Sequence, residues 1–162
     1  MKVLFVCLGN ICRSPTVEGV ARILAAREVP QLDLQFDSAG TAGYHIGSPP
    51  DPRSCVAAAG RGYDISGLRA RQLQREDFTR FDLLLAMDRD NLAAMQQLSP
   101  AGERHRVRLF LSLLGKAASA DVPDPYYGGP EDFQKVLDLA EAGSRALFVA
   151  VAAQGAAART DR

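Results

Sequence analysis

The sequence contains no tryptophan, two histidines, three cysteines and no excess of either charge. An odd number of cysteines argues against a disulfide framework. We expect no metal and no other cofactor, because there is no Cys-x-x-Cys pair and His45 and His105 lie far apart in the chain. Nineteen basic residues balance nineteen acidic ones, so no global field would recruit nucleic acid or an anionic membrane.

Long apolar runs are also missing. No stretch approaches the ~20 apolar residues that a membrane helix needs. The N-terminus does not resemble a signal peptide, because its very short apolar run leads at once into reactive residues. We therefore expect a cytoplasmic protein, with a monomer favoured. A length of 162 residues suits one domain, which we place at residues 1–155, with residues 156–162 as a flexible tail.

What the sequence does contain is a thiol and a guanidinium at close spacing, in MKVLFVCLGNICRSPTVEG. Cys7 ends an apolar run that predicts a strand buried on both faces. Arg13 follows after five residues, where a helical pattern begins. The predicted phosphate-binding loop consists of Leu8, Gly9, Asn10, Ile11, Cys12 and Arg13.

A loop of this size fits a phosphate group. Its peptide N–H groups can turn inward, Gly9 permits sharp backbone geometry, and the following helix adds positive potential. Arg13 offers a planar fork to two phosphate oxygens, and the same field favours the nucleophilic thiolate form of Cys7. The alternative is a buried structural cysteine and a surface arginine at a strand–helix junction.

Strands alternate with helices along the chain, which predicts a single-domain α/β fold with an open parallel sheet flanked by helices. The expected strands are residues 2–7, 33–38, 82–86 and 107–110. The expected helices are residues 14–27, 53–60, 91–98 and 131–152, with a helical turn near 74–78. For the first helix, Ser14 is the expected N-cap, Pro15 the first helical residue and Glu18 a first-turn acid. Cys7 would then lie at the carboxyl end of a strand, where such sheets bind ligands.

The segment CLGNICRSP resembles the signature of the low-molecular-weight protein tyrosine phosphatases. The similarity continues in DSAGTAGYHIGSPPDPR (37–53), RARQL (69–73), FDLLLAMDRDN (81–91) and VPDPYYGG (122–129), in the family's order and over nearly the whole chain. The resemblance implies a four-stranded flavodoxin-like sheet. It also implies hydrolysis of protein phosphotyrosine and aryl phosphate monoesters through a cysteinyl-phosphate, with Cys7 as nucleophile and Arg13 as phosphate clamp. The implied partners are phosphotyrosine-containing proteins, with a tyrosine kinase among the candidates.

Hydrolysis through a thiolate also needs an acid for the leaving oxygen. Asp124 is the candidate, because prolines on both sides stiffen its backbone and Pro125 biases it toward an extended conformation. An ordinary Asp-Pro turn would explain the same residues. The resemblance favours the functional interpretation, since the family's general acid matches Asp124. Asp121 is a nearby competitor, but no proline follows it.

Aromatic side chains can form the walls of a cleft for an aryl phosphate, each stacked pair contributing ~1 kcal/mol. Tyr126 and Tyr127 follow the candidate acid directly, and Tyr44 lies in the long loop after the second expected strand. The resemblance implies that these three side chains line the entrance and that Leu8 touches the aryl group. Tyrosines that merely cover the core are the alternative.

Three polar residues are candidates to support the loop. Asn10 tolerates left-handed backbone geometry, and the resemblance implies a hydrogen bond from its side chain to Ser38. Ser14 could stabilise the Cys7 thiolate, cap the helix, or do both.

Cys12 is the expected redox partner of Cys7, because a neighbouring thiol can trap an oxidised thiolate as a disulfide, and family members with this second cysteine behave similarly. A small apolar residue facing the core is the alternative. Cys55 is expected to fill space on a helix. His45 and His105 are expected on loops or at the surface. Asp88 and Asp90 could approach the site from the end of the third expected strand, but acids at a helix start are the simpler explanation.

Two other functions compete with phosphatase activity. A thiol-based arsenate reductase of the same fold needs further cysteines, which residues 80–92 lack, and it leaves the Asp-Pro-Tyr loop unexplained. A phosphotyrosine-binding module without turnover needs neither Cys7 nor Asp124. The reductase is the closer alternative.

Overall fold

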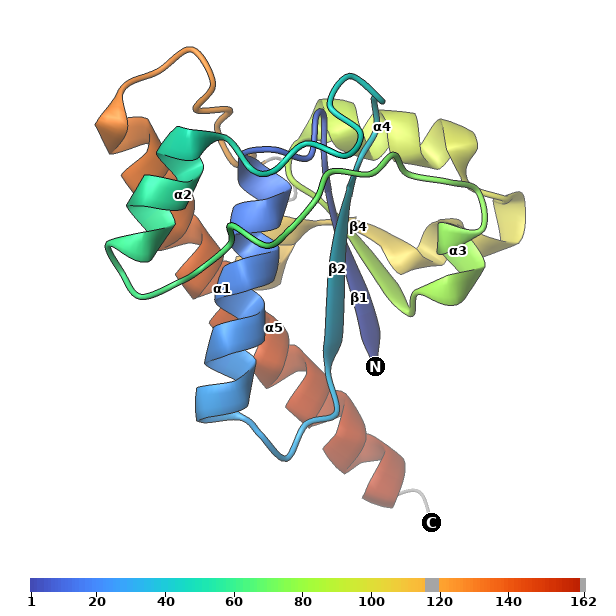
Figure 1. Ribbon diagram of the computed structural model, residues 1–162. Coiled ribbons are helices and arrows are strands. Elements are labelled where there is room, and N and C mark those ends of the chain that lie inside the picture. Colours follow the sequence, from blue (N-terminus) through green and yellow to red (C-terminus); the bar gives the residue numbers. More distant parts are fainter. Residues whose placement is uncertain (116–119, 161–162) are drawn as a thin grey trace.

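The computed structural model describes residues 1–115 and 120–160. In this part of the chain four parallel strands form one sheet in the order β2-β1-β3-β4. The strands are β1 (Lys2–Cys7), β2 (Gln35–Gly40), β3 (Leu83–Ala86) and β4 (Val107–Leu109). The predicted α/β fold, an open four-stranded parallel sheet flanked by helices, is confirmed (Figure 1).

Helices cover both faces of the sheet (Figure 1). One layer contains α1 (Arg13–Glu28) and the long α5 (Pro130–Thr160), with α2 (Pro52–Ala59) packed on α5. The opposite layer contains α3 (Asp77–Arg80) and α4 (Arg89–Leu98). Two short 3₁₀ segments, η1 (Ala101–Arg106) and η2 (Phe110–Leu114), flank β4.

The side chains of β1 alternate between the two layers. Val3, Phe5 and Cys7 belong to the hydrophobic cluster that includes α1 and α5, whereas Leu4 and Val6 belong to the cluster on the α3 and α4 side. Val3 to Val6 are fully buried, as expected for a central strand of a parallel sheet. Because side chains alternate with a period of two, the Cys7 thiol lies on the α1 face.

The start of α1 differs from the prediction. The helix begins at Arg13, its N-cap is Cys12 without a side-chain hydrogen bond, and no acid lies in its first turn. Ser14 is therefore not the cap, Pro15 is not the first helical residue and Glu18 lies deeper in the helix. The reason is that the loop after β1 continues directly into the helix, while the Ser14 hydroxyl faces the Cys7 sulfur.

Several other elements are shifted or longer than predicted. Strand β2 is Gln35–Gly40 rather than 33–38, because it pairs with β1 up to its last residue, Cys7 opposite Gly40. Helix α3 is Asp77–Arg80 rather than a turn at 74–78. Helix α5 continues to Thr160, through most of the expected flexible tail, and its alanine-rich end favours a helix. Residues 161 and 162 of that tail lie outside the described residues.

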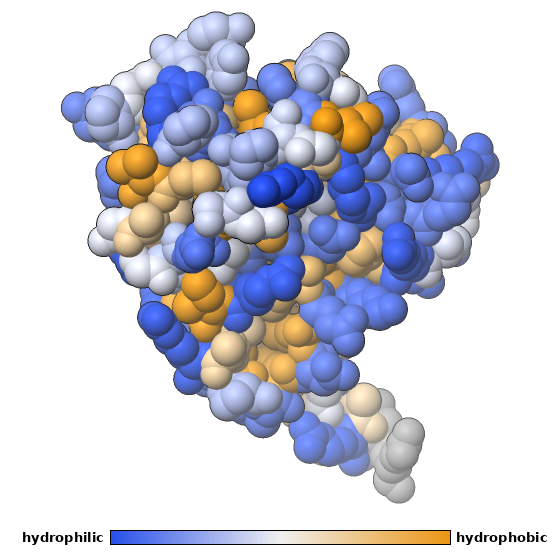
Figure 2. Space-filling view, viewed as in Figure 1, coloured by the Kyte–Doolittle hydropathy of each residue, from blue (hydrophilic) through white to orange (hydrophobic). Residues whose placement is uncertain are grey.

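Apolar residues on the face shown in Figure 2 form separate patches among polar ones. Several of the large exposed apolar side chains belong to one region at the carboxyl end of β1, namely Leu8, Tyr44, Tyr126 and Tyr127. Among the described helices, none is both long enough and apolar enough to cross a membrane.

Candidate active site

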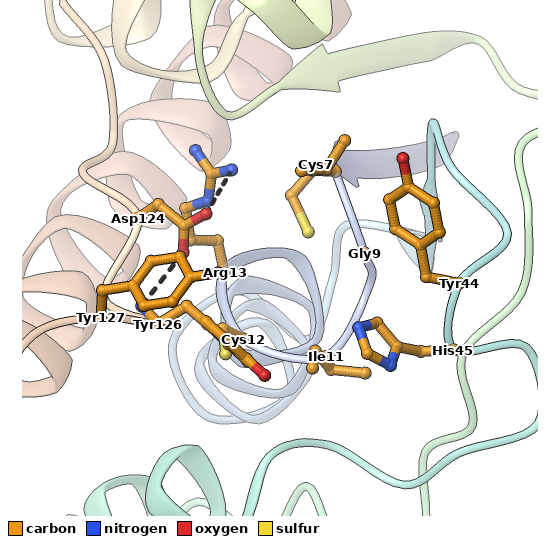
Figure 3. A pocket seen from close by; sticks show the side chains of 11 residues that line it. Cys7, Gly9, Ile11, Cys12, Arg13, Tyr44, His45, Asp124, Tyr126 and Tyr127 are labelled. Atoms are coloured by element: carbon orange, nitrogen blue, oxygen red, sulfur yellow. Dashed lines mark hydrogen bonds and ion pairs between the residues drawn. The ribbon is translucent and has the colours of Figure 1, made fainter.

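A cleft of about 350 Å³ opens at the carboxyl end of β1. Figure 3 shows the Cys7 sulfur between Arg13 and Asp124 on one side and Tyr44 and His45 on the other. Apart from the support residues Asn10, Ser14 and Ser38, all of the predicted site residues line this cleft, together with one that was not predicted. The lining consists of Cys7, Leu8, Gly9, Ile11, Cys12, Arg13, Tyr44, His45, Asp124, Tyr126 and Tyr127.

The Cys7 thiol is almost fully buried, with 3% of the residue exposed. The backbone N–H of Asn10 donates to its sulfur at 3.3 Å, and the Ser14 Oγ lies 3.0 Å from it. The Ser14 oxygen already accepts a hydrogen bond from the Asn10 side chain, so its hydroxyl proton is free to donate to the sulfur. Two donors therefore point at the sulfur from within the loop and the first turn of α1, an arrangement that favours negative charge on that atom.

Asn10 maintains the curvature of the loop. Its φ of 57° is left-handed, a conformation that asparagine tolerates better than most residues. Its side-chain nitrogen donates to Ser38 Oγ at 2.9 Å and to Ser14 Oγ at 2.8 Å, so the predicted contact with Ser38 is confirmed. Its side-chain oxygen accepts from the backbone N–H of Arg71 at 3.0 Å.

This network ends at a buried carboxylate, Glu18, which was expected only as a first-turn acid of the helix. Ser38 Oγ donates to Glu18 Oε2 at 2.6 Å, and Arg22 donates to the other Glu18 oxygen. Burial raises the pKa of Glu18, although the hydrogen bond from Ser38 opposes the rise. Glu18 therefore fixes the orientation of the Ser38 hydroxyl beneath the loop.

Arg13 lies beside the thiol with only 3% of its surface exposed. Its Nη1 donates to Asp88 Oδ2 at 2.6 Å and to the carbonyl oxygen of Val122 at 3.1 Å. Burial by itself would lower the pKa of Arg13, but the negative charges of Cys7, Asp88 and Asp124 outweigh burial and the pKa is raised. The guanidinium is thus a fixed cation at the floor of the cleft.

For Asp88 an acid at the start of a helix was the simpler expectation, and an approach to the site was the alternative. Asp88 is the N-cap of α4, where its side chain accepts from the backbone N–H of Asn91, and it also holds Arg13. The sequence could not choose between these roles, because both depend on how the end of β3 lies beside the end of β1. The register of these two strands, Val6 opposite Ala86, brings them together.

Of the two candidate acids, Asp124 is the one at the cleft. Its Oδ2 lies 3.6 Å from Arg13 Nη2, and its side chain is about half exposed at 47%. Its Oδ1 accepts the backbone N–H of Tyr126 at 3.2 Å. Asp121 instead accepts from the backbone N–H of Arg89 at 3.0 Å and pairs with the Arg89 guanidinium, so it does not line the cleft.

The predicted aromatic rim is present. Tyr44 and Tyr127 are strongly exposed, and Tyr126 and Tyr127 meet edge to face with ring centroids 4.9 Å apart. Tyr63, which is outside the cleft, is buried and donates to Glu141. His45 was missed, and its position next to Tyr44 was the one available signal. A Cβ on Gly9 would lie 3.0 Å from its ring, so His45 covers the loop.

The other two cysteines differ from Cys7 in their surroundings. Cys12 is buried in the wall of the cleft, and burial raises the pKa of its thiol to about 12. Cys55 is half-buried on α2, where it packs against the core and donates to the carbonyl of Pro50. Across residues 1–115 and 120–159, no three histidine, cysteine or acidic side chains are grouped so that they could hold a metal ion.

The fold and the cleft together place a thiol and a guanidinium at the carboxyl end of a parallel strand, which is where open α/β sheets bind ligands. The profile described as low molecular weight phosphotyrosine protein phosphatase matches residues 2–157. The chain belongs to this family. It is a hydrolase of the protein-tyrosine-phosphatase class.

Individual relatives extend over nearly the whole chain. A low molecular weight protein-tyrosine-phosphatase of Streptomyces coelicolor is 42% identical over 156 residues, 94% of each chain. The structure of a protein tyrosine phosphatase from Entamoeba histolytica, with Hepes in its active site, matches with a TM-score of 0.89 at 34% identity and covers 96% of this chain and 99% of that one. Vibrio vulnificus Wzb, in complex with benzylphosphonate, matches with a TM-score of 0.78 at 32% identity and covers 90% and 95%.

Proposed function

We propose that the chain hydrolyses phosphotyrosine in proteins, and aryl phosphate monoesters in general, through a phosphate ester of Cys7. The observation that carries this proposal is the convergence of three groups on one cleft. The Cys7 sulfur lies at its floor, Arg13 lies beside it, and Asp124 Oδ2 is 3.6 Å from the Arg13 guanidinium.

In the first step, the loop N–H groups and Arg13 hold the phosphoryl oxygens. The Cys7 thiolate attacks phosphorus, the bond from phosphorus to the phenolic oxygen breaks, and Asp124 donates its proton to that oxygen. The phenol leaves, and Asp124 is then a carboxylate.

In the second step, Asp124 takes a proton from water as the water oxygen attacks the phosphorus of the cysteinyl-phosphate. The sulfur–phosphorus bond breaks, inorganic phosphate leaves and the thiolate returns. The exposed carboxylate of Asp124 supports this double use, because water can approach it. The donors from Asn10 and Ser14 make the sulfur a better leaving group.

The preference for an aryl ester follows from the depth of the cleft and from the side chains that line it. Cys7 is only 3% exposed, so a substrate must carry its phosphate well below the rim of the cleft. A tyrosine side chain provides that reach, and its ring can stack on Tyr126 or Tyr44 and contact Leu8. The binding of benzylphosphonate by the Vibrio vulnificus relative supports an aromatic ligand here. Among protein substrates, a tyrosine kinase stays a prediction.

We also propose that the enzyme is redox-sensitive. Peroxide would oxidise the Cys7 thiolate to a sulfenic acid with release of hydroxide. The Cys12 thiolate would then attack that sulfur and displace hydroxide, which leaves a disulfide that a thiol reductant reopens. Their presence in the lining of one cleft supports this pairing.

Turnover without added metal tests the function. We expect rapid release of phosphate from an aryl phosphate and a phosphotyrosine peptide, little from a phosphoserine peptide, and no reduction of arsenate by a thiol donor. Reduction of arsenate would favour the reductase, and tight binding of phosphotyrosine without release of phosphate would favour the binding module. Cytoplasmic location and a monomeric state stay predictions, to be checked by cell fractionation and by size-exclusion chromatography.

A further inference from the structure

We propose that Arg53, held by Asp51, is a positioning residue that orients the acid loop Asp124–Tyr126 over the cleft. This proposal rests on the proposed role of Asp124 as the general acid. Arg53 does not line the cleft itself, and its side chain acts through Tyr126.

Asp51 fixes the Arg53 guanidinium in one orientation. The Asp51 carboxylate accepts from Nε of Arg53 at 3.0 Å and from Nη2 at 2.9 Å. It also accepts the backbone N–H of Arg53 at 2.8 Å, as the N-cap of α2. The pairing raises the pKa of Arg53 and lowers that of Asp51. A fork bound at two nitrogens leaves the third, Nη1, aimed in a fixed direction.

That third nitrogen binds the acid loop. Nη1 of Arg53 donates to the carbonyl oxygen of Tyr126 at 2.9 Å. The guanidinium also lies over the Tyr126 ring, 5.4 Å from its centroid, and over the Phe133 ring of α5, 4.8 Å from its centroid. Both are cation–π contacts, in which the ring face attracts the cation. Tyr126 is thus held by both its backbone and its ring.

Tyr126 in turn orients the acid. Its backbone N–H donates to Asp124 Oδ1, which leaves Oδ2 as the oxygen that faces Arg13. Figure 3 draws both contacts. A proton carried on Oδ2 would be directed at the leaving oxygen of a bound ester.

The same unit is connected to the phosphate-binding loop. The backbone N–H of Asp51 donates to the carbonyl oxygen of Ile11 at 2.8 Å. Asp51 and Arg53 therefore connect the loop that holds the phosphate to the loop that carries the acid, and they set the distance between the two. General acid catalysis depends strongly on that geometry.

The test compares an ester that needs the acid with one that does not. Arg53→Met keeps an unbranched aliphatic stem but removes the guanidinium. In this variant kcat/KM should fall about tenfold for phenyl phosphate and less than about threefold for p-nitrophenyl phosphate, whose leaving group is stable without a proton. Arg53→Lys should recover part of the loss, since it keeps a donor for Tyr126 but cannot bind Asp51 at the same time through two nitrogens.

Arg61→Met is the matched control. Arg61 follows α2 and pairs with Asp138 and Glu141 of α5, so it ties the same two helices without touching the acid loop. It should change both substrates equally and by less than about twofold. Inhibition by inorganic phosphate should be unchanged in Arg53→Met, because the phosphate-binding loop keeps its contacts.

A double-mutant cycle decides the matter. In an Asp124→Asn background the loss from Arg53→Met should shrink below about twofold, because there is no acid left to orient. Equal losses for both esters, or an undiminished loss in that background, would overturn the proposal. Asp51→Asn keeps a capping oxygen and should reproduce the selective loss if Arg53→Met folds poorly. If Asp124→Asn itself lacks selectivity for the poor leaving group, the role of Asp124 in the proposed function fails as well.

Discussion

Asp88 holds Arg13 with one carboxylate oxygen and caps helix α4 with the other, at 2.6 Å and 2.7 Å respectively. The predicted phosphate-binding loop after β1 is therefore held at Arg13 by the N-terminus of α4, the helix that follows β3. Since only 20% of the Asp88 side chain is exposed, this contact is shielded from water and orients the guanidinium more firmly than a surface ion pair would.

Asp88→Asn should lower kcat/KM by about tenfold to a hundredfold, because Arg13 loses the charged partner that aligns its fork. Asparagine is a good N-cap, so the thermal unfolding midpoint should change little. Asp90→Asn, in the exposed first turn of the same helix, is the control and should leave activity unchanged. A large drop in stability without a loss of kcat/KM would show that Asp88 acts only as a cap.

Cys7→Ser should abolish turnover, with a loss of at least ~10³-fold, because serine at this position is a far weaker nucleophile. Binding of inorganic phosphate or vanadate should persist, since the loop and Arg13 remain. Isothermal titration and a stopped assay measure the two quantities separately. A variant that keeps a tenth of the wild-type rate would exclude Cys7 as the nucleophile.

Arg13→Lys should lose activity nearly as far as Arg13→Ala, by ~10²–10³-fold. An ammonium group can replace the charge but not the contacts to Asp88, to the Val122 carbonyl and to two phosphate oxygens together. Steady-state kinetics on one aryl phosphate suffice for the comparison. Near-normal rates in the lysine variant would mean that Arg13 contributes long-range charge only.

Asp124→Asn should slow esters with poor leaving groups by ~10²–10⁴-fold and activated aryl phosphates much less. Asp121→Asn is the matched control, because Asp121 pairs with Arg89 away from the cleft, and it should affect both substrates little. The slope of log kcat/KM against the acidity of the leaving phenol is the measurement. An unchanged slope in Asp124→Asn would indicate a role in positioning alone.

Disulfide formation between Cys7 and Cys12 should be slow near neutrality and accelerate as the pH rises. Burial raises the pKa of Cys12 to about 12, so only a small fraction is the attacking thiolate at pH 7, and that fraction grows with each step toward pH 12. Peroxide inactivation at several pH values, followed by mass spectrometry, measures whether the rate of disulfide formation rises with pH as expected. Cys55→Ala should behave like the wild type, and Cys12→Ala should recover poorly on reduction. A Cys7–Cys55 bond, or no disulfide, would remove the protective role of Cys12.

Local patterns were enough to predict the open parallel sheet and the position of Cys7 and Arg13 between its first strand and the helix that follows. The apolar run before Cys7, the spacing to Arg13 and the alternation of strands and helices each depend on nearby residues. Gly9 and Asn10 likewise predicted a sharp bend in the loop from their own residue types. The left-handed φ of Asn10 agrees with that prediction.

What local patterns did not reveal are contacts between distant segments, and the contact of Asn10 with Ser38 was expected from the family resemblance alone. Arg13 and Asp88 meet because β3 pairs with β1, and Arg53 meets Tyr126 because α2 packs on α5. Neither partner carries a local signal of its role. The predicted start of α1 was also wrong, for a physical reason. The free N–H groups at the N-terminus of a helix can bind an anion instead of a capping side chain, so a side-chain cap is not required there.

The alternation of β1 between two layers limits how this protein can change. Cys7 faces α1 because it shares the parity of Val3 and Phe5. Inserting or deleting a single residue in β1 would place the thiol among Phe78 and Met95, on the side of the sheet away from Ser14. Insertions of two residues would preserve the face but lengthen the strand. Single-residue insertions and deletions are therefore expected to be tolerated in loops far from β1. A library of β1 length variants, screened for turnover, should yield active clones only where Cys7 still faces α1.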